Sequence, residues 1–172
     1  MHDEILTPNA TALWSQLGRF ENFYLAGGTA LALQIGHRRS VDFDLFSANT
    51  LPTRLLDRVK RTFTSQSIIV TYRSPEQLNL VINDVKVTFL FFNYPVIDPL
   101  VKYKGFQLAS VREIASMKAF AIGKRMSYKD YIDWYFLLKE HRVELTDVIV
   151  HAKQKFGNDF NDRLFLGQLV SF

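Results

Sequence analysis

Apolar residues and glycines near the start of the chain follow an order that predicts three elements. The apolar run Phe23–Ala26 predicts a short strand, which stops at Gly27-Gly28. Thr29 can then cap a helix that ends at Gly36, since glycine suits the left-handed conformation that follows many helices. A strand, a glycine turn and a helix are therefore expected in direct succession.

A strand that carries two carboxylates is predicted next. Val41–Phe46 alternates polar and apolar residues, which is the period of a strand whose two faces differ. In such a strand Asp42 and Asp44 lie on one face, and the apolar side chains lie on the other. Two carboxylates are therefore expected side by side on the predicted sheet.

A β-hairpin is predicted in the middle of the chain. Gln77–Ile82 and Val85–Phe91 both alternate, and Asn83-Asp84 between them tolerates positive φ better than most residue pairs. The other elements predicted for this half are helices at Thr11–Leu17 and Leu51–Phe63 and a strand at Ile68–Tyr72.

Helical periodicity dominates the last third of the chain. Ser110-Val111-Arg112-Glu113 has the form of a capping box and begins a helix that runs to about Ile122. Three more helices are predicted, at Tyr128–Glu140 after Ser127, at Leu145–Phe156 and at Phe160–Val170. The first of these three carries a predicted apolar stripe made of Tyr131, Ile132, Tyr135, Phe136 and Leu138.

The order of these elements predicts an α+β protein. Residues 1–105 are expected to form a mixed-sheet α/β lobe and residues 106–172 a helical lobe, packed as one compact unit and connected through Asn93–Gly105. No apolar run reaches the roughly 18 residues that span a bilayer, and the first residues do not resemble a signal peptide. A cytoplasmic protein without membrane contact is therefore expected.

Composition narrows the chemistry of any metal site. The chain has no cysteine, so oxygen or imidazole must hold a metal, which favours hard ions such as Mg²⁺. The formal net charge of +4 favours a polyanionic partner, although many basic proteins bind no nucleic acid.

The glycine turn and the carboxylate strand together match what phosphoryl transfer requires. Metal ions must neutralise the triphosphate charge, and paired carboxylates supply a site for them. Glycines at a helix N-terminus let phosphates reach backbone N–H groups without a side chain in the way. Either feature alone is common as a packing turn or a solvated strand edge, but in this order they predict a metal-nucleotide site.

The same residues resemble a known family. Gly27-Gly28-Thr29-Ala30-Leu31 followed by the block Gly36–Phe46, with the later Lys118 and Lys129–Asp133, is similar to the AbiEii/AbiGii group of toxin nucleotidyltransferases over about residues 20–140. The resemblance implies a polymerase-beta-like nucleotidyltransferase fold and magnesium-dependent transfer of a nucleotide from a nucleoside triphosphate. It also implies an RNA acceptor such as tRNA and a toxin role beside a cognate antitoxin.

The resemblance further implies roles for individual residues. Asp42 and Asp44 would bind magnesium, Lys118 would meet the triphosphate, and Asp133 would occupy a catalytic acidic position. The other nucleotide-binding candidates are Gly27, Gly28, Thr29, His37, Arg38, Ser40, Arg125, Lys129 and Asp130.

Structural explanations remain open for several of these residues. Lys118 could be an ordinary solvated lysine, and His37 could be a loop histidine. The charged group that follows Ser127 could form local ion pairs across neighbouring helical turns.

Thr88 departs from the pattern of the wider superfamily, which usually places a third carboxylate on a neighbouring central strand. A neutral hydroxyl is a poor magnesium ligand and a weak base. Asp84 lies about 13 Å away along the strand, whereas Asp98 lies in a proline-flanked loop that could fold back.

Three hypotheses therefore remain. The first is an active nucleotidyltransferase that modifies RNA. The second is a catalytically impaired nucleotide-binding relative that acts through a protein partner, with Thr88 marking the loss. The third is a scaffold without a nucleotide site.

Overall fold

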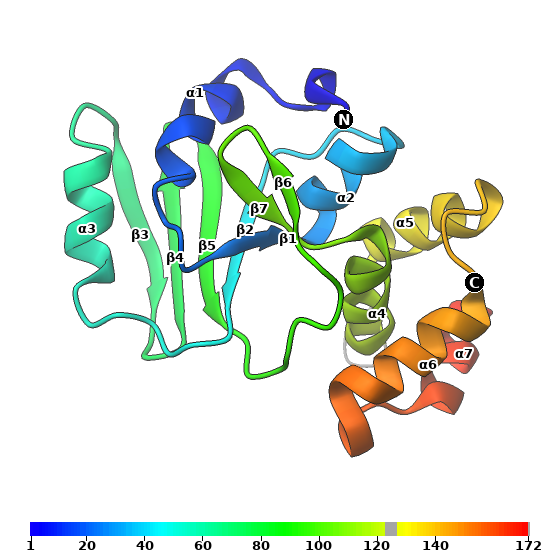
Figure 1. Cartoon of the computed structure of the whole chain (residues 1–172). Coiled ribbons are helices and arrows are strands. Elements are labelled where there is room, and N and C mark those ends of the chain that lie inside the picture. Colours follow the sequence, from blue (N-terminus) through cyan, green and yellow to red (C-terminus); the bar gives the residue numbers. More distant parts are fainter. Residues whose placement is uncertain (123–126, 172) are drawn as a thin grey trace. The chain divides into compact units, whose positions relative to one another are not determined.

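The chain divides into a sheet unit and a helical unit. The computed structural model describes residues 1–122 and 127–171 (Figure 1). The sheet unit contains Met1–Asn93 and Leu100–Leu108, and the helical unit contains Tyr94–Pro99 and Ala109–Phe172. The predicted connection, residues 93–105, is thus divided between the two units: residues 94–99 belong to the helical unit and residues 100–105 to the sheet unit.

A mixed sheet forms the centre of the sheet unit. In the part of the chain that the structure describes, it has seven strands in the order β3-β4-β5-β2-β1-β7-β6. The pairs β2–β5 and β1–β7 are parallel, and the other neighbouring pairs are antiparallel. The strands are β1 (Tyr24–Ala26), β2 (Phe43–Ser47), β3 (Ile68–Arg73), β4 (Gln77–Ile82), β5 (Val85–Phe91), β6 (Val101–Tyr103) and β7 (Phe106–Leu108).

Helices cover one face of this sheet. Trp14 of α1 (Pro8–Leu17) packs edge-on against Phe43 and Phe106, with ring centroids 6.0 and 5.5 Å apart. Two apolar residues of α3 (Leu55–Thr62) are buried, and Phe20 stacks on Phe63 just beyond that helix. Along β2, β4 and β5 the buried residues alternate with partly exposed ones, which is the pattern of a sheet with one covered and one open face.

The α+β class and most of the predicted elements are confirmed. The hairpin turn lies at Asn83-Asp84, with φ of 46° and 65°, and Gly36 ends α2 (Gly27–Ile35) in the left-handed conformation. The predicted cap of α2 is wrong, because the helix begins at Gly27 and the cap position falls on Ala26. The hydroxyl of Thr29 instead bonds Ser40 and the Asp42 carbonyl.

The sheet unit also differs from expectation at β2, at α3 and in the segment before β7. β2 begins at Phe43, so Asp42 lies just before the strand. α3 begins at Leu55 rather than Leu51, since the Pro52 carbonyl already accepts the Leu55 N–H in a separate turn. The segment predicted as a plain connection contains β6, which pairs with β7 around a turn in which Lys104 and Gly105 have φ of 44° and 77°.

The helical unit consists of α4 (Val111–Ile122), α5 (Tyr128–Lys139), α6 (Leu145–Phe156), η2 (Gly157–Asp159) and α7 (Asp162–Leu169). Its aromatic packing includes Phe120 stacked on Phe156, with centroids 4.1 Å apart, and Trp134 tilted against Phe165 at 5.0 Å. No helix among the described residues is long and apolar enough to cross a membrane.

The predicted apolar stripe of α5 is wrong. The buried residues of this helix are Asp130, Asp133, Trp134 and Leu137, whereas Tyr135 is 56% exposed. These buried positions have the spacing of one helical face, but two of them carry charge. Asp130 and Asp133 can lie on the buried face because the buried Lys118 ammonium group compensates their charges.

The predicted capping box of α4 is half correct. The Ser110 hydroxyl accepts the Glu113 N–H at 3.0 Å, as expected of the first half of the motif. The Glu113 side chain is fully buried and instead accepts hydrogen bonds from Lys155 and from two backbone N–H groups of the segment before β6.

Candidate functional site

Gly27 brings the N-terminus of α2 against a carboxylate. Ala26 at the end of β1 pairs with Asp44 of β2, so the chain turns into the helix directly beside that aspartate. Gly27 has φ of +70°, and a Cβ built on it would lie 2.7 Å from Asp44 Oδ2. Glycine is the residue that suits both this positive φ and this close approach of the backbone to the Asp44 carboxylate.

Gly28 provides a second close approach at the same helix end. A Cβ at this position would lie 2.3 Å from Arg38 Nη2 and 3.4 Å from Ser40 Oγ. The Arg38 guanidinium therefore lies against the first turn of α2. A helix N-terminus has unsatisfied N–H groups and a positive dipole, and an adjacent arginine adds charge, so this corner suits a phosphate.

Thr29 positions the segment that leads into β2. Its side chain is 1% exposed, and its hydroxyl donates to the Asp42 carbonyl at 2.5 Å and pairs with Ser40 Oγ at 2.8 Å. Because a hydroxyl has one proton, Ser40 is the donor of the second bond. These contacts hold Asp42 beside Asp44, while His37 lies half-buried in the preceding loop.

Thr88 is the direct neighbour of Asp44 on the next strand. β5 runs parallel to β2 and pairs Thr88 with Asp44, and β4 pairs Asn79 with Thr88 from the other side. Asp84 lies in the hairpin turn, and Asp98 belongs to the helical unit. A hydroxyl therefore occupies the position at which the superfamily pattern places a carboxylate.

This arrangement fits a hard divalent cation. Asp42 and Asp44 are both half-exposed and offer only oxygen ligands, as Mg²⁺ prefers. A Cβ on Gly27 would lie against Asp44, so the absence of a side chain there keeps the carboxylate and the N-terminus of α2 close together.

Lys118 joins two helices of the helical unit through buried ion pairs. Its Nζ lies 2.8 Å from Asp130 Oδ1 and 2.6 Å from Asp133 Oδ2, and all three residues are at most 6% exposed. The alternative of a solvated lysine is therefore wrong, and both aspartates of α5 pair with a lysine of α4. Lys129 is exposed, and Arg125 lies outside the described residues.

The structure thus brings the predicted site residues together in two groups. The residues between Gly27 and Asp44 meet in the sheet unit, and Lys118 meets Asp130 and Asp133 in the helical unit.

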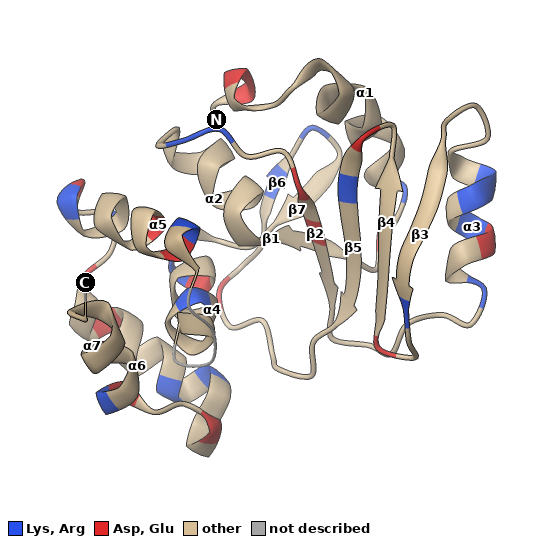
Figure 2. Cartoon of the chain, turned by 180° about the vertical axis from the view of Figure 1, so that it is seen from behind, with Lys and Arg blue, Asp and Glu red and all other residues tan. Residues whose placement is uncertain are grey.

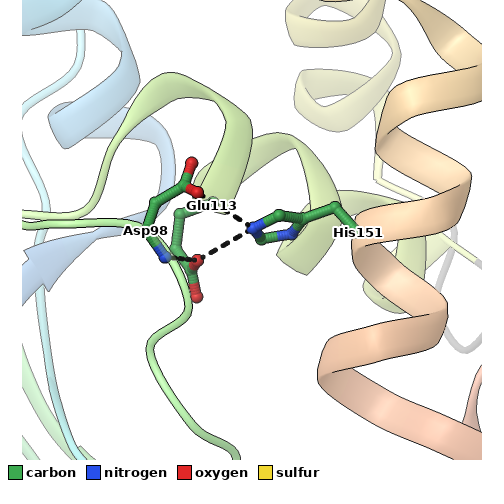
Figure 3. Close-up of side chains that lie close together, drawn as sticks. All are labelled: Asp98, Glu113 and His151. Carbon is green, nitrogen blue, oxygen red and sulfur yellow. Dashed lines mark hydrogen bonds and ion pairs between the residues drawn. The ribbon is translucent and has the colours of Figure 1, made fainter.

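A third group of ionisable residues was not predicted. His151 Nε2 of α6 lies 3.4 Å from both Asp98 Oδ1 and Glu113 Oε2, and the ligand atoms of the three side chains lie within 4.8 Å of one another (Figure 3). These atoms could hold a metal ion. The carboxylates already have cationic partners, however, since Arg112 binds Asp98 and Lys155 binds Glu113.

The charges of this third group are therefore balanced without a metal. The Arg112 guanidinium, with help from the Ser110 hydroxyl, lowers the pKa of Asp98 to about 2. His151 Nδ1 pairs with the buried Ser116 hydroxyl at 2.8 Å. The residues come from three distant segments, so no local pattern in the sequence could have identified the group.

Comparisons with known proteins identify the class of protein to which this fold belongs, the nucleotidyltransferases. The family described as nucleotidyl transferase AbiEii toxin of type IV toxin–antitoxin systems matches residues 11–102. An uncharacterized protein of Aquifex aeolicus (strain VF5) is 35% identical over 165 residues, which cover 91% of this chain and 76% of that protein. The chain belongs to the AbiEii nucleotidyltransferase toxin family.

Solved structures show that the fold is shared more widely. A Helicobacter pylori protein described as a candidate nucleotidyltransferase is 19% identical, with a TM-score of 0.61 over 94% of this chain and 91% of that one. The Megavirus polyadenylate synthase is 13% identical, with a TM-score of 0.56 over 78% of this chain and 31% of that one.

Proposed function

We propose that this nucleotidyltransferase transfers a nucleotide from a nucleoside triphosphate to an RNA acceptor such as tRNA, as the cytoplasmic toxin of a pair with a cognate antitoxin. The observation that carries the proposal is the contact between the N-terminus of α2 and Asp44, which a side chain at Gly27 would block. Phosphate-binding backbone and metal-binding carboxylate then lie in one corner of the sheet unit.

Each residue of this corner has a distinct task. Asp42 and Asp44 hold Mg²⁺, and the chemistry that magnesium supplies there is neutralisation of charge on the transferred phosphoryl group. The N–H groups of α2 and the Arg38 guanidinium bind phosphate oxygens. Thr29 and Ser40 are positioning residues, because they fix the backbone of Asp42.

The helical unit contributes further candidates for nucleotide binding and catalysis. Lys118 is the candidate partner of the triphosphate, and Asp130 and Asp133 hold its ammonium group in place. Asp133 remains the candidate for the catalytic acidic position, and His37, Arg125 and Lys129 remain candidates for nucleotide contacts. The net charge of +4 and the fold shared with a polyadenylate synthase support a nucleic-acid acceptor.

Calorimetry and a transfer assay test this function in turn. Titration of nucleoside triphosphates in Mg²⁺ should give heat with the wild type and with Asp57→Ala, a control at an exposed aspartate of α3, but not with Asp42→Ala. Radiolabel from the triphosphate should then appear in bulk tRNA. No magnesium-dependent heat with the wild type would overturn the nucleotide site, and heat without transfer would overturn the reaction.

Thr88 favours a second candidate function, in which the chain binds nucleotide without efficient transfer and acts through a protein partner. Its pairing with Asp44 puts Thr88→Asp next to the metal-binding carboxylates. A large gain of transfer in this variant would support the second candidate. Unchanged or lower transfer would mean that the site works with two carboxylates.

A further inference from the structure

Four side chains form a row across the open face of the sheet, beginning at the proposed metal site. The strand registers pair Asp44 with Thr88, Thr88 with Asn79, and Asn79 with Tyr72. Directly paired residues project from the same face of a sheet. At about 4.8 Å per strand, Tyr72 lies about 14 Å from Asp44, on the edge strand β3.

A β-bulge turns Tyr72 onto this face. Ile69 pairs with Val81 on the open face, and Val70 pairs with Leu80 on the covered face. Strict alternation would return Tyr72 to the covered face, but the register shifts between Val70 and Tyr72 so that Tyr72 opposes Asn79. Bulges often re-aim a side chain next to an active site.

The row is accessible and borders on apolar and basic groups. Tyr72 is 53% exposed, and Ile69 on the same strand is 57% exposed. Lys86 is exposed and pairs with Val81, which places its charge one row from Thr88 on the same face. Figure 2 shows β2, β5, β4 and β3 with no helix of the described sheet unit drawn in front of them.

The chemistry of the row suits an unpaired nucleic-acid strand. An exposed tyrosine ring is a platform on which a base can stack. Gln77 Nε2 donates to Asn79 Oδ1 at 2.9 Å, which orients the Asn79 amide and presents its NH₂ group as a donor. Lys86 supplies positive charge for a phosphate.

We propose that this row is the track that holds the single-stranded end of the RNA acceptor, with a base stacked on Tyr72 and the terminal nucleotide at Asp44. The proposal rests on the proposed function for the identity of the acceptor. Tyr72 and Asn79 bind the substrate at a distance from the reaction, so they determine which RNA ends are accepted.

Binding of labelled RNA tests the track separately from catalysis. Fluorescence anisotropy with a short fluorescein-labelled single-stranded RNA should show a Kd about tenfold higher for Tyr72→Ala and nearly unchanged for Tyr72→Phe, which keeps the stacking ring. Tyr135→Ala, at a tyrosine of α5 that is 56% exposed, is the matched control and should bind like the wild type. Blunt duplex RNA should bind more weakly than the single strand.

A second measurement identifies the contact directly. A thiouridine placed near the end of the RNA should photo-cross-link to the peptide that contains β3. Tyr72→Ala should give the same magnesium-dependent heat of nucleotide binding as the wild type, because the nucleotide site does not include Tyr72. If the wild type itself gave no such heat, the proposed function would fail, whereas the RNA-binding measurements would still test the track.

Three results would overturn the track. They are an unchanged Kd in Tyr72→Ala, an equal loss in Tyr135→Ala, and equal binding of duplex and single strand. If light scattering showed a dimer for the wild type and a monomer for Tyr72→Ala, with RNA binding unchanged, the face would instead be assigned to contact with a second copy of the chain.

Discussion

At the scale of the residue, Gly27 is where backbone conformation and site chemistry meet. We expect Gly27→Ala to lose about 1–2 kcal/mol of unfolding free energy, because φ of +70° disfavours a side chain. Its Cβ would also displace the Asp44 carboxylate. We expect kcat/KM to fall about hundredfold, since a misplacement of about 1 Å in an active site costs roughly that factor. Transfer kinetics and thermal unfolding measure the two effects.

Gly105→Ala is the control that separates backbone strain at positive φ from the contact of a new Cβ with Asp44. Gly105 has φ of +77°, but a Cβ there meets nothing within 4 Å. This variant should share the loss of stability and keep normal transfer. If both variants lost transfer equally, the close approach to Asp44 would not be the cause.

The candidate residues of this corner could be predicted from sequence, but their contacts could not. The glycine pair and the alternation around Asp42 and Asp44 are local patterns. The hydrogen bond from Thr29 to the Asp42 carbonyl depends on how the loop between them returns to the helix. The sequence alone fits a helix-capping role for Thr29 equally well.

At the scale of the element, α4 and α5 are joined by the Lys118 ion pairs. Removing one partner of a buried pair leaves an uncompensated charge, so Lys118→Met should lose about 3–5 kcal/mol of unfolding free energy. Lys60→Met, at an exposed lysine of α3, should stay within about 0.5 kcal/mol of the wild type in denaturant unfolding.

A combined variant checks the reason for that loss. Lys118→Met with Asp130→Asn and Asp133→Leu removes the orphaned carboxylates and should recover much of the stability. No recovery would show that Lys118 stabilises by packing rather than by charge.

Elements were predicted best where the pattern was local and strong. The β4–β5 hairpin follows from alternation and its Asn-Asp turn, whereas the short β6–β7 hairpin was hidden in a segment with two prolines. The buried face of α5 could not be predicted, since Asp130 and Asp133 are buried only because Lys118 reaches them from α4. The bulge in β3 could not be predicted either, because the strict alternation used to predict strands does not show where a register shift occurs.

At the scale of the whole molecule, the chain passes from the sheet unit to the helical unit and back before β6. Residues 94–99 belong to the helical unit because their polar groups bind there. The N–H groups of Ile97 and Asp98 donate to Glu113, and the Pro95 carbonyl accepts from Lys155. The network around Asp98, Glu113 and His151 therefore anchors a segment that is continuous in sequence with the sheet unit.

This anchor predicts a specific acid sensitivity of the helical unit. The pKa of Asp98 is about 2 in the folded chain, below its ordinary value of 3.8, so its ionised form stabilises the fold above pH 3.8. That contribution should be lost as the pH falls through about 2. Trp14 and Trp134 lie one in each unit, so Trp14→Phe leaves Trp134 as the reporter of the helical unit.

In the Trp14→Phe background, acid unfolding followed by Trp134 fluorescence should differ between Asp98 variants. Asp98→Asn should be less stable than its parent at neutral pH and should lose less further stability between pH 3.8 and about 2. Asp57→Asn, at an exposed aspartate of the sheet unit, should follow the parent throughout. Parallel acid curves for Asp98→Asn and its parent would mean that Arg112 does not hold Asp98 ionised, and that residues 94–99 are anchored mainly through Glu113 and Lys155.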